Sequence, residues 1–269
     1  MLRLALRVRA EDAEVVLAEL LELAPGGVEQ VDGEGWVEYA IYGASGEIPE
    51  LPDLRATAGG ALIEVTTTEV GDDWAERWRE FHRPLVIDGR LRVRPPWEPP
   101  GPERLDIVID PGRAFGTGAH PTTALCLELL LDSDRLGGSL LDLGCGSGVL
   151  AILAGRLGFA PVSAVDNDPL AVEVSAANCA VNGVDVACSR LDLRSERIPE
   201  ADVLVANILA PVLIDLAVRL GRFTGREAIL SGILDEQADE VASAWGRAGA
   251  TVTESRSRSG WTALRLAAA

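Results

Sequence analysis

The sequence has no lysine, so every strongly basic side chain among its 269 residues is an arginine. It also has no apolar run that approaches the roughly 20 residues of a bilayer-spanning helix, which excludes a transmembrane helix. The first residues alternate apolar side chains with arginine, and this alternation predicts a β-strand rather than a signal peptide. We therefore expect a protein that acts in the cytoplasm and has no membrane partner.

Cysteine is scarce, and its spacing does not match a metal-binding motif. Cys126, Cys145, Cys179 and Cys188 form no C-x-x-C pair. This spacing excludes the usual zinc-binding motifs and a disulfide framework. We interpret the four cysteines as reduced packing residues and expect no metal site.

Basic residues are few relative to acidic ones. There are 24 against 42, which gives a formal net charge of −18 at pH 7. This charge disfavours direct binding to the nucleic-acid backbone. It favours a basic protein as partner, through steering and complementary patches, although it also serves solubility alone. The hydrophobic content of 48% supports a core in one large or two modest domains.

The first part of the chain, residues 1–68, predicts a small α+β domain. Val28–Val31 and Trp36–Ile41 predict a hairpin around a glycine-containing turn. A short helix near Leu51–Ala58 leads into Ile63–Thr68, which is rich in β-branched residues. Before them, Leu2–Val8 alternate as a strand and Val15–Leu21 have the spacing of a helix. The resulting order β-α-β-β-α-β suggests a ferredoxin-like domain. Such a domain can bind a partner or be purely structural, and the sequence leaves both open.

Residues 69–104 predict a linker. A helix carries Trp74 and Trp78, which are four apart and share a face, and we interpret them as packing residues. The stretch Pro95–Pro102 is too rich in proline for regular structure and predicts a stiff, extended connection. Residues 105–269 then form a second, larger domain of alternating strands and helices.

The stretch around which the chain is organised is Leu140–Gly148, which reads LLDLGCGSG. It predicts a strand, a tight turn with Gly144, Gly146 and Gly148, and a helix. Dinucleotide sites prefer G-x-G-x-x-G. Here the spacing is G-x-G-x-G, and the carboxylate of Asp142 suits an ammonium or sulfonium ligand better than a pyrophosphate. The pattern resembles the first motif of class I S-adenosylmethionine-dependent methyltransferases. A glycine turn that only packs a helix on a sheet is the alternative.

Polar side chains end two further predicted strands. Asp166 and Asn167 follow a short apolar strand, about 20 residues after the glycine turn, where an acid usually bonds ribose hydroxyls. Asn207 ends a buried strand at the ligand edge of the same sheet. Its carboxamide oxygen can accept a hydrogen bond from a substrate amine and aim the nitrogen lone pair at a methyl group. The alternative is that Asn207 caps the following helix.

A glycine-rich loop precedes these elements. Phe115 is flanked by small residues and can lie over a flat ligand such as adenine. Pro121 suits the first turn of a helix, with His120 beside its cap. The hydroxyls of Thr122 and Thr123 can reach a ligand carboxylate at this helix start. We interpret His120 as a cap or supporting residue rather than a base, and a plain surface loop remains the alternative.

Taken together, these stretches resemble the family of ribosomal protein L11 methyltransferases. The resemblance covers about two-thirds of the chain and is most specific in FGTGAHPTT and ANILA. The matching stretches are DDWAERWREF, IDPGRAFGTGAHPTT, LLDLGCGSGVLAI, VDNDPLAVEVSAANCAVNG, DVLVANILA and LSGIL. The N-terminal domain matches by pattern and position only.

The resemblance implies a fold, a cofactor and a reaction. The C-terminal domain would be a Rossmann-like class I methyltransferase domain, a doubly wound, mostly parallel sheet with an antiparallel C-terminal hairpin. It would bind S-adenosylmethionine and methylate lysine side chains and the α-amino group of ribosomal protein L11, which the N-terminal domain would recognise. We expect a monomer. The implied cofactor-binding residues are Phe115, Gly116, Thr117, Thr123, Gly144, Gly146, Asp166, Asn167 and Asn207.

Three alternatives remain at this point. Another class I methyltransferase, acting on a different protein or a small amine, would share the cofactor domain and differ in recognition. The glycine spacing and Asp142 argue against a nicotinamide dehydrogenase. A binding module without activity is disfavoured by the intact set of Gly144, Asp166 and Asn207.

Overall fold

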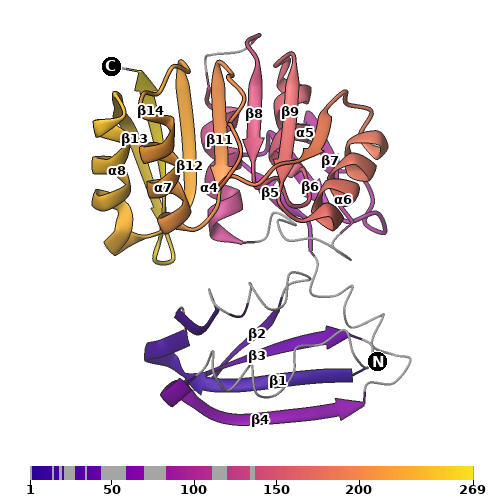
Figure 1. Cartoon of the computed structure of the whole chain (residues 1–269). Coiled ribbons are helices and arrows are strands. Elements are labelled where there is room, and N and C mark those ends of the chain that lie inside the picture. The colour runs from indigo at the N-terminus through magenta and orange to yellow at the C-terminus, as the bar shows by residue number, and fades with distance from the viewer. Residues whose placement is uncertain are drawn as a thin grey trace. The chain divides into compact units, whose positions relative to one another are not determined.

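The computed structural model describes residues 2–13, 15–17, 20, 28–33, 35–43, 59–69, 83–110, 120–133 and 137–268. The chain divides into two compact units, Met1–Phe81 and His82–Ala269 (Figure 1). The expected helices near Leu51–Ala58 and around Trp74 and Trp78 lie outside the described residues.

The N-terminal unit is built on a four-stranded antiparallel sheet with the order β2-β3-β1-β4. Leu4, Leu6 and Val8 alternate along β1 and are buried on one face, as the sequence pattern predicts. Helical residues follow β1, so the predicted small α+β domain with its hairpin is confirmed. The elements are β1 (Leu2–Arg9), η1 (Ala10–Asp12), β2 (Glu29–Gly33), β3 (Trp36–Gly43), η2 (Gly59–Ala61) and β4 (Leu62–Glu69).

The C-terminal unit contains a seven-stranded sheet with the order β10-β9-β8-β11-β12-β14-β13. The first five strands in this order are parallel. β14 pairs antiparallel with β12, and β13 pairs antiparallel with β14. This arrangement confirms the predicted Rossmann-like fold with its antiparallel C-terminal hairpin. The strands are β8 (Leu140–Leu143), β9 (Val162–Asp166), β10 (Ala187–Arg190), β11 (Val203–Asn207), β12 (Glu227–Leu234), β13 (Ala250–Arg258) and β14 (Trp261–Ala268).

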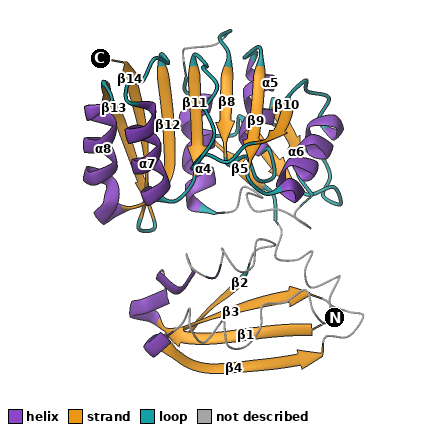
Figure 2. Cartoon of the chain, in the orientation of Figure 1, coloured by secondary structure: helices purple, strands orange, loops and turns teal. Residues whose placement is uncertain are grey.

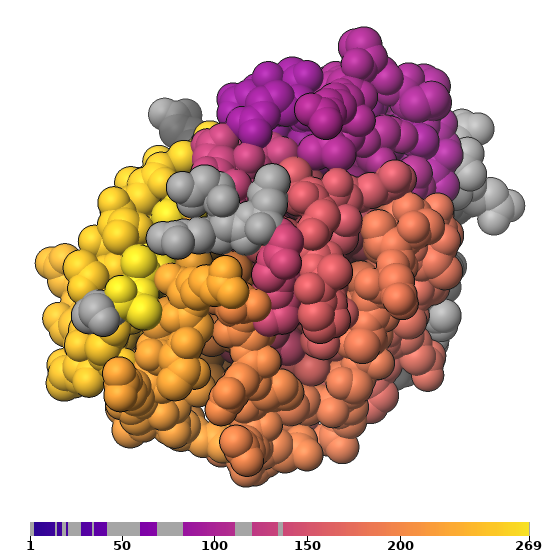
Figure 3. Space-filling view, turned by 90° about the horizontal axis from the view of Figure 1, so that it is seen from above, coloured from indigo at the N-terminus to yellow at the C-terminus, as the bar shows by residue number. Residues whose placement is uncertain are grey.

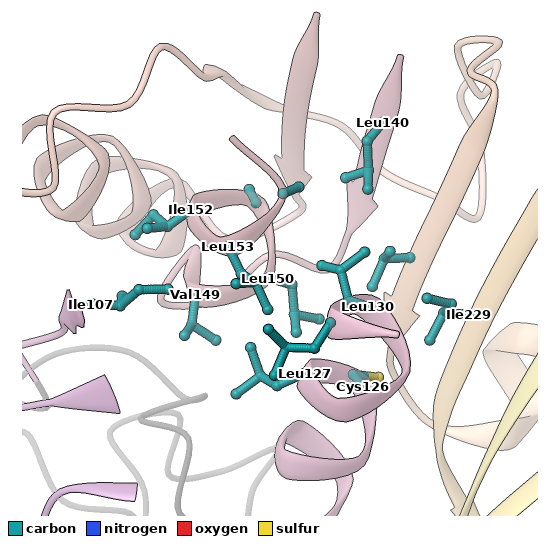
Figure 4. Packing of buried hydrophobic residues seen from close by; sticks show 14 of the residues in the cluster. Ile107, Cys126, Leu127, Leu130, Leu140, Val149, Leu150, Ile152, Leu153 and Ile229 are labelled. Atoms are coloured by element: carbon teal, nitrogen blue, oxygen red, sulfur yellow. The ribbon is translucent and has the colours of Figure 1, made fainter. Parts of the chain in front are cut away.

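Helices cover both faces of this sheet (Figure 2). Alternate strand residues divide between two cores, because successive side chains of a strand point to opposite faces. Leu140 packs with α4 and α5 in one core, which Figure 4 shows from close by, whereas Leu141 packs with α7 and α8 in the other. The helices are α4 (Pro121–Leu131), α5 (Val149–Leu157), α6 (Pro169–Val181), α7 (Ala210–Leu220) and α8 (Ala238–Arg247), the last preceded by η3 (Asp235–Gln237).

A small third sheet belongs to the C-terminal unit. Its order is β5-β6-β7, with strands Leu85–Ile87, Leu91–Arg94 and Leu105–Val108. Its apolar side chains, such as Leu91, are buried in the core that contains α4 and α5. Residues 83–110 are the purple atoms of Figure 3. For residues 69–104 the sequence predicted a linker. Within the described part of that range, Leu85–Ile87 and Leu91–Arg94 form strands and residues 95–104 lack regular structure.

A buried ion pair holds the C-terminal end of α4 against the large sheet. Arg265 of β14 lies 3.1 Å from the Glu227 carboxylate of β12, and its guanidinium also donates to the Leu129 carbonyl. Ser133 donates to the same carboxylate at 3.0 Å. These contacts fix the orientation of α4, so its N-terminus at Pro121 is held relative to the carboxyl edge of the sheet.

No helix in the described part of the chain is long and apolar enough to cross a bilayer. No group of three or more His, Cys, Asp or Glu side chains in these ranges is placed to hold a metal ion. The four cysteines are free thiols, and only Cys188 is partly exposed.

Candidate functional site

The glycine turn lies between β8 and α5 and depends on backbone conformations that favour glycine. Gly144, Gly146 and Gly148 have φ values of 72°, 51° and 80°. A Cβ atom on Gly144 would lie 2.4 Å from the Ile208 side chain. The amides of Gly144 and Cys145 both donate to the Val165 carbonyl, at 2.8 and 3.0 Å. The turn is therefore packed against β9 and against the segment after β11.

Asp142 is a fully buried acid one residue before the end of β8. Its Oδ2 accepts a hydrogen bond from the Ala151 amide at 3.2 Å. Its Oδ1 has no hydrogen-bond partner among the described residues. Burial raises the pKa of this carboxyl from 3.8 to about 7. A buried carboxylate oxygen without a partner is costly, and an ammonium or sulfonium ligand would relieve that cost.

Asp166 ends β9 and is tied to the glycine turn. Its Oδ2 accepts from the Gly146 amide and its Oδ1 from the Asp168 amide, each at 3.0 Å. Each carboxylate oxygen can accept a second hydrogen bond, so the partly exposed carboxylate still has acceptor capacity for ribose hydroxyls. Asn167 beside it is exposed, and its carbonyl accepts from Arg190 Nε at 3.0 Å.

Asn207 ends β11 and contacts the start of α4. Its Nδ2 donates to Thr123 Oγ1 at 3.1 Å, across 84 residues of sequence. This orientation leaves the carboxamide oxygen as an acceptor. The N-cap of α7 is Leu209, with no side-chain cap hydrogen bond, so Asn207 does not cap that helix as the alternative supposed.

His120 caps α4, as the sequence suggested. Its side chain accepts from the Thr122 amide, and Nδ1 lies 2.7 Å from the Thr122 hydroxyl. The imidazole meets the Trp261 ring edge-on at 5.2 Å between centroids. Burial lowers the pKa of His120 to about 4, so the ring is neutral at pH 7. A histidine with this pKa is a poor acceptor for the proton of a substrate ammonium.

The structure therefore gathers most of the predicted residues at one edge. The turn follows β8, Asp166 ends β9 and Asn207 ends β11, and these parallel strands are neighbours. Their carboxyl ends are the edge at which such sheets bind ligands. Phe115, Gly116 and Thr117 lie outside the described residues, so their roles stay predictions.

These residues fit S-adenosylmethionine by their chemistry. Asp142 offers an unsatisfied carboxylate oxygen to a cation, and Asp166 offers acceptors to hydroxyl groups.

Asn178, which the sequence analysis missed, lies behind the turn and donates a hydrogen bond to the Ser147 carbonyl. The only signal for it was a polar residue on the buried side of a largely apolar helix.

Comparisons with known proteins identify relatives of this chain. The model of the family described as "Ribosomal protein L11 methyltransferase (PrmA)" matches residues 18–268. A ribosomal protein L11 methyltransferase of Pseudomonas aeruginosa is 38% identical over 283 residues, which cover 97% of this chain and 96% of that protein. One of Heliobacterium modesticaldum is 43% identical over 199 residues, covering 72% of this chain and 63% of the relative.

A solved structure of a related protein shares the fold. The crystal structure of ribosomal protein L11 methylase from Lactobacillus delbrueckii subsp. bulgaricus superimposes with a TM-score of 0.64 at 29% identity. The alignment covers 70% of this chain and 99% of that chain. With a family match that spans nearly the whole sequence, this chain belongs to the ribosomal protein L11 methyltransferase family.

Proposed function

We propose that this chain transfers methyl groups from S-adenosylmethionine to lysine side chains and to the α-amino group of ribosomal protein L11. The observation that carries the proposal is the set of acceptor groups at one sheet edge. Asp142 has a buried oxygen without a partner in the described structure, and Asn207 has its carboxamide oxygen available beside it in sheet order. Family membership supports the choice of reaction.

The cofactor would be held by residues of this edge. Asp142 would pair with its cationic end, and Asp166, already fixed by the Gly146 amide, would accept from its ribose hydroxyls. Asn167, Gly144 and Thr123 would line the same site. When bound, the sulfonium supplies a methyl group that an amine can attack in line.

The acceptor amine must be neutral to attack, whereas a free lysine has a pKa near 10.4. Asn207 would accept a hydrogen bond from the amine through Oδ1. This bond would point the lone pair of the amine nitrogen at the methyl carbon. Rate acceleration would come from this alignment and from desolvation of the amine. His120 is too weak a base for the proton, so water takes it as the amine enters the site.

The division of labour within the chain is part of the proposal. The N-terminal unit would recognise the substrate protein, and the C-terminal unit, which includes the small sheet β5-β6-β7, would carry out the transfer. The net charge of −18 would attract a basic ribosomal protein and disfavour direct contact with RNA. We further propose that the protein works as a monomer in the cytoplasm.

Mass spectrometry of purified ribosomal protein L11 tests the proposal. After incubation with this protein and S-adenosylmethionine, we expect mass gains in steps of one methyl group. Asp166→Ala is expected to abolish the gain, because the ribose acceptor and the support of the Gly146 amide are both removed. Glu173→Ala, an exposed acid of α6, is the matched control and should methylate normally.

Two outcomes would count against different parts of this proposal. If the wild-type protein binds S-adenosylmethionine but L11 gains no mass, the substrate assignment falls and the cofactor site stands. A panel of other proteins and small amines would then be assayed. If the wild-type protein binds no S-adenosylmethionine, the cofactor site falls as well.

A further inference from the structure

Two buried asparagines at the end of α6, Asn178 in the helix and Asn182 at its C-cap, join this helix to other parts of the C-terminal unit. Asn178 and Asn182 lie one helical turn apart and are 5% and 4% exposed. Buried amide groups are almost always hydrogen-bonded, so their partners identify what the helix holds in place.

Asn182 serves the small sheet. The Val108 amide of β7 donates to its Oδ1 at 2.8 Å, and its Nδ2 donates to the Val108 carbonyl at 2.7 Å. The side chain thus pairs with the strand as another strand would. Its Nδ2 also donates to the Asn178 carbonyl at 2.8 Å. Within the described ranges, no hydrogen bond of the Asn182 side chain reaches the glycine turn.

Asn178 connects two segments that flank the cofactor site. Its Nδ2 donates to the Ser147 carbonyl in the glycine turn at 2.9 Å, across 31 residues of sequence. Its Oδ1 accepts from the Asp110 amide, just after β7, at 3.5 Å across 68 residues. The Asn178 side chain therefore holds the glycine turn in place relative to the end of β7.

The peptide between Ser147 and Gly148 is held at both of its polar groups. Its carbonyl accepts from Asn178, and its N–H donates to the Cys145 carbonyl at 2.8 Å. Gly146 and Gly148 flank Ser147 with positive φ values, and glycines do little to restrict the rotation of adjacent peptides. The restraint on this peptide must come from its hydrogen-bond partners.

We propose that Asn178 is a positioning residue for cofactor binding, because it orders the glycine turn before the cofactor arrives. Without the amide donor, the Ser147–Gly148 peptide samples other orientations, and the cost of ordering it is subtracted from the binding free energy. The loss falls on cofactor affinity and not on the transfer step, since Asn178 contacts neither Asn207 nor Thr123 by any hydrogen bond in the described structure.

The pair Asn178→Leu and Asn182→Leu tests this role in the full-length protein. Both substitutions remove a buried amide of similar size from the same helix, but only the first releases the turn. By isothermal titration with S-adenosylmethionine, we expect Asn178→Leu to raise Kd about tenfold, as expected for one lost hydrogen bond. We expect Asn182→Leu to change Kd less than about threefold, with kcat at saturating cofactor nearly unchanged in both.

Equal rises in Kd for the two variants, or an unchanged Kd for Asn178→Leu, would overturn the proposal. If Asn178→Leu fails to fold, Asn178→Asp keeps the oxygen that faces the Asp110 amide and replaces the donor to Ser147 with a second carboxylate oxygen. The same tenfold rise is then expected against Asn182→Asp, and its absence contradicts the role. The inference rests on the proposed cofactor site: wild-type protein that binds no S-adenosylmethionine overturns both, whereas unchanged binding in the variant overturns only the role of Asn178.

Discussion

Asp142→Asn is expected to weaken binding of S-adenosylmethionine about a hundredfold at pH 8, because it removes one partner of a buried charge pair. The substitution keeps the shape of the side chain, so the strand and the turn after it should be preserved. The same change should stabilise the cofactor-free protein. Burial makes the charged form of Asp142 unfavourable in the folded state, and asparagine carries no charge to bury.

This gain in stability depends on pH. The pKa of Asp142 is raised from 3.8 to about 7, so the folded state binds the proton more tightly than the unfolded state. The free energy of unfolding of the wild-type protein therefore falls as pH rises from about 4 to 7. Asparagine does not titrate, so the advantage of Asp142→Asn should grow over that window to roughly 4 kcal/mol. Urea unfolding of both proteins at pH 5 and pH 8 should show about 3 kcal/mol of this difference, because the rest has already developed at pH 5.

Cofactor affinity should have the opposite pH dependence. The carboxylate must be ionised to pair with a cation, so the Kd of the wild-type protein should fall as pH rises toward 7, and binding should release protons. The Kd of Asp142→Asn should change little over this range. Asp185→Asn removes the same charge from an exposed position and is the control. Wild-type affinity in Asp142→Asn would show that the buried oxygen has no ligand.

The parts of the fold that follow from local sequence were predictable. Leu140–Gly148 specifies a strand, a turn and the start of a helix within nine residues, and the structure places each of them there. Asp166 and Asn207 were placed correctly because each directly follows a short apolar run that forms a parallel strand. Periodicity and turn chemistry carry this information without knowledge of any distant partner.

The parts that depend on distant partners were not predictable. β5 and β6 are three and four residues long, next to a proline-rich stretch, and β6 becomes a strand by pairing in parallel with β7. The bonds of Asn207 to Thr123 and of Asn178 to Ser147 join residues 84 and 31 positions apart. A pattern of burial shows that a side chain is inside, but it does not name the group that the side chain meets.

Asn207→Ala is expected to lower kcat at saturating S-adenosylmethionine about a hundredfold, because misalignment of the attacking nitrogen by about 1 Å costs that much. The Kd of the cofactor should change less than about threefold, since Asn207 acts on the amine and other residues hold the cofactor. Steady-state methylation of L11 and isothermal titration give the two values. An equal loss in both would contradict an aligning role and leave Asn207 as a cofactor ligand alone.

The orientation of Asn207 depends on Thr123, and this dependence should appear as coupling. Thr123→Val removes the hydroxyl that accepts from Asn207 Nδ2 at 3.1 Å, so the carboxamide can rotate and kcat should fall about tenfold. Thr123→Ser keeps the hydroxyl and should stay near wild type. Thr122→Val controls for damage to the start of α4, because the Thr122 hydroxyl meets His120 and not Asn207. In the Asn207→Ala background, Thr123→Val should cost little more, because the group it orients is already gone. Additive losses would mean that Thr123 acts on the cofactor independently of Asn207.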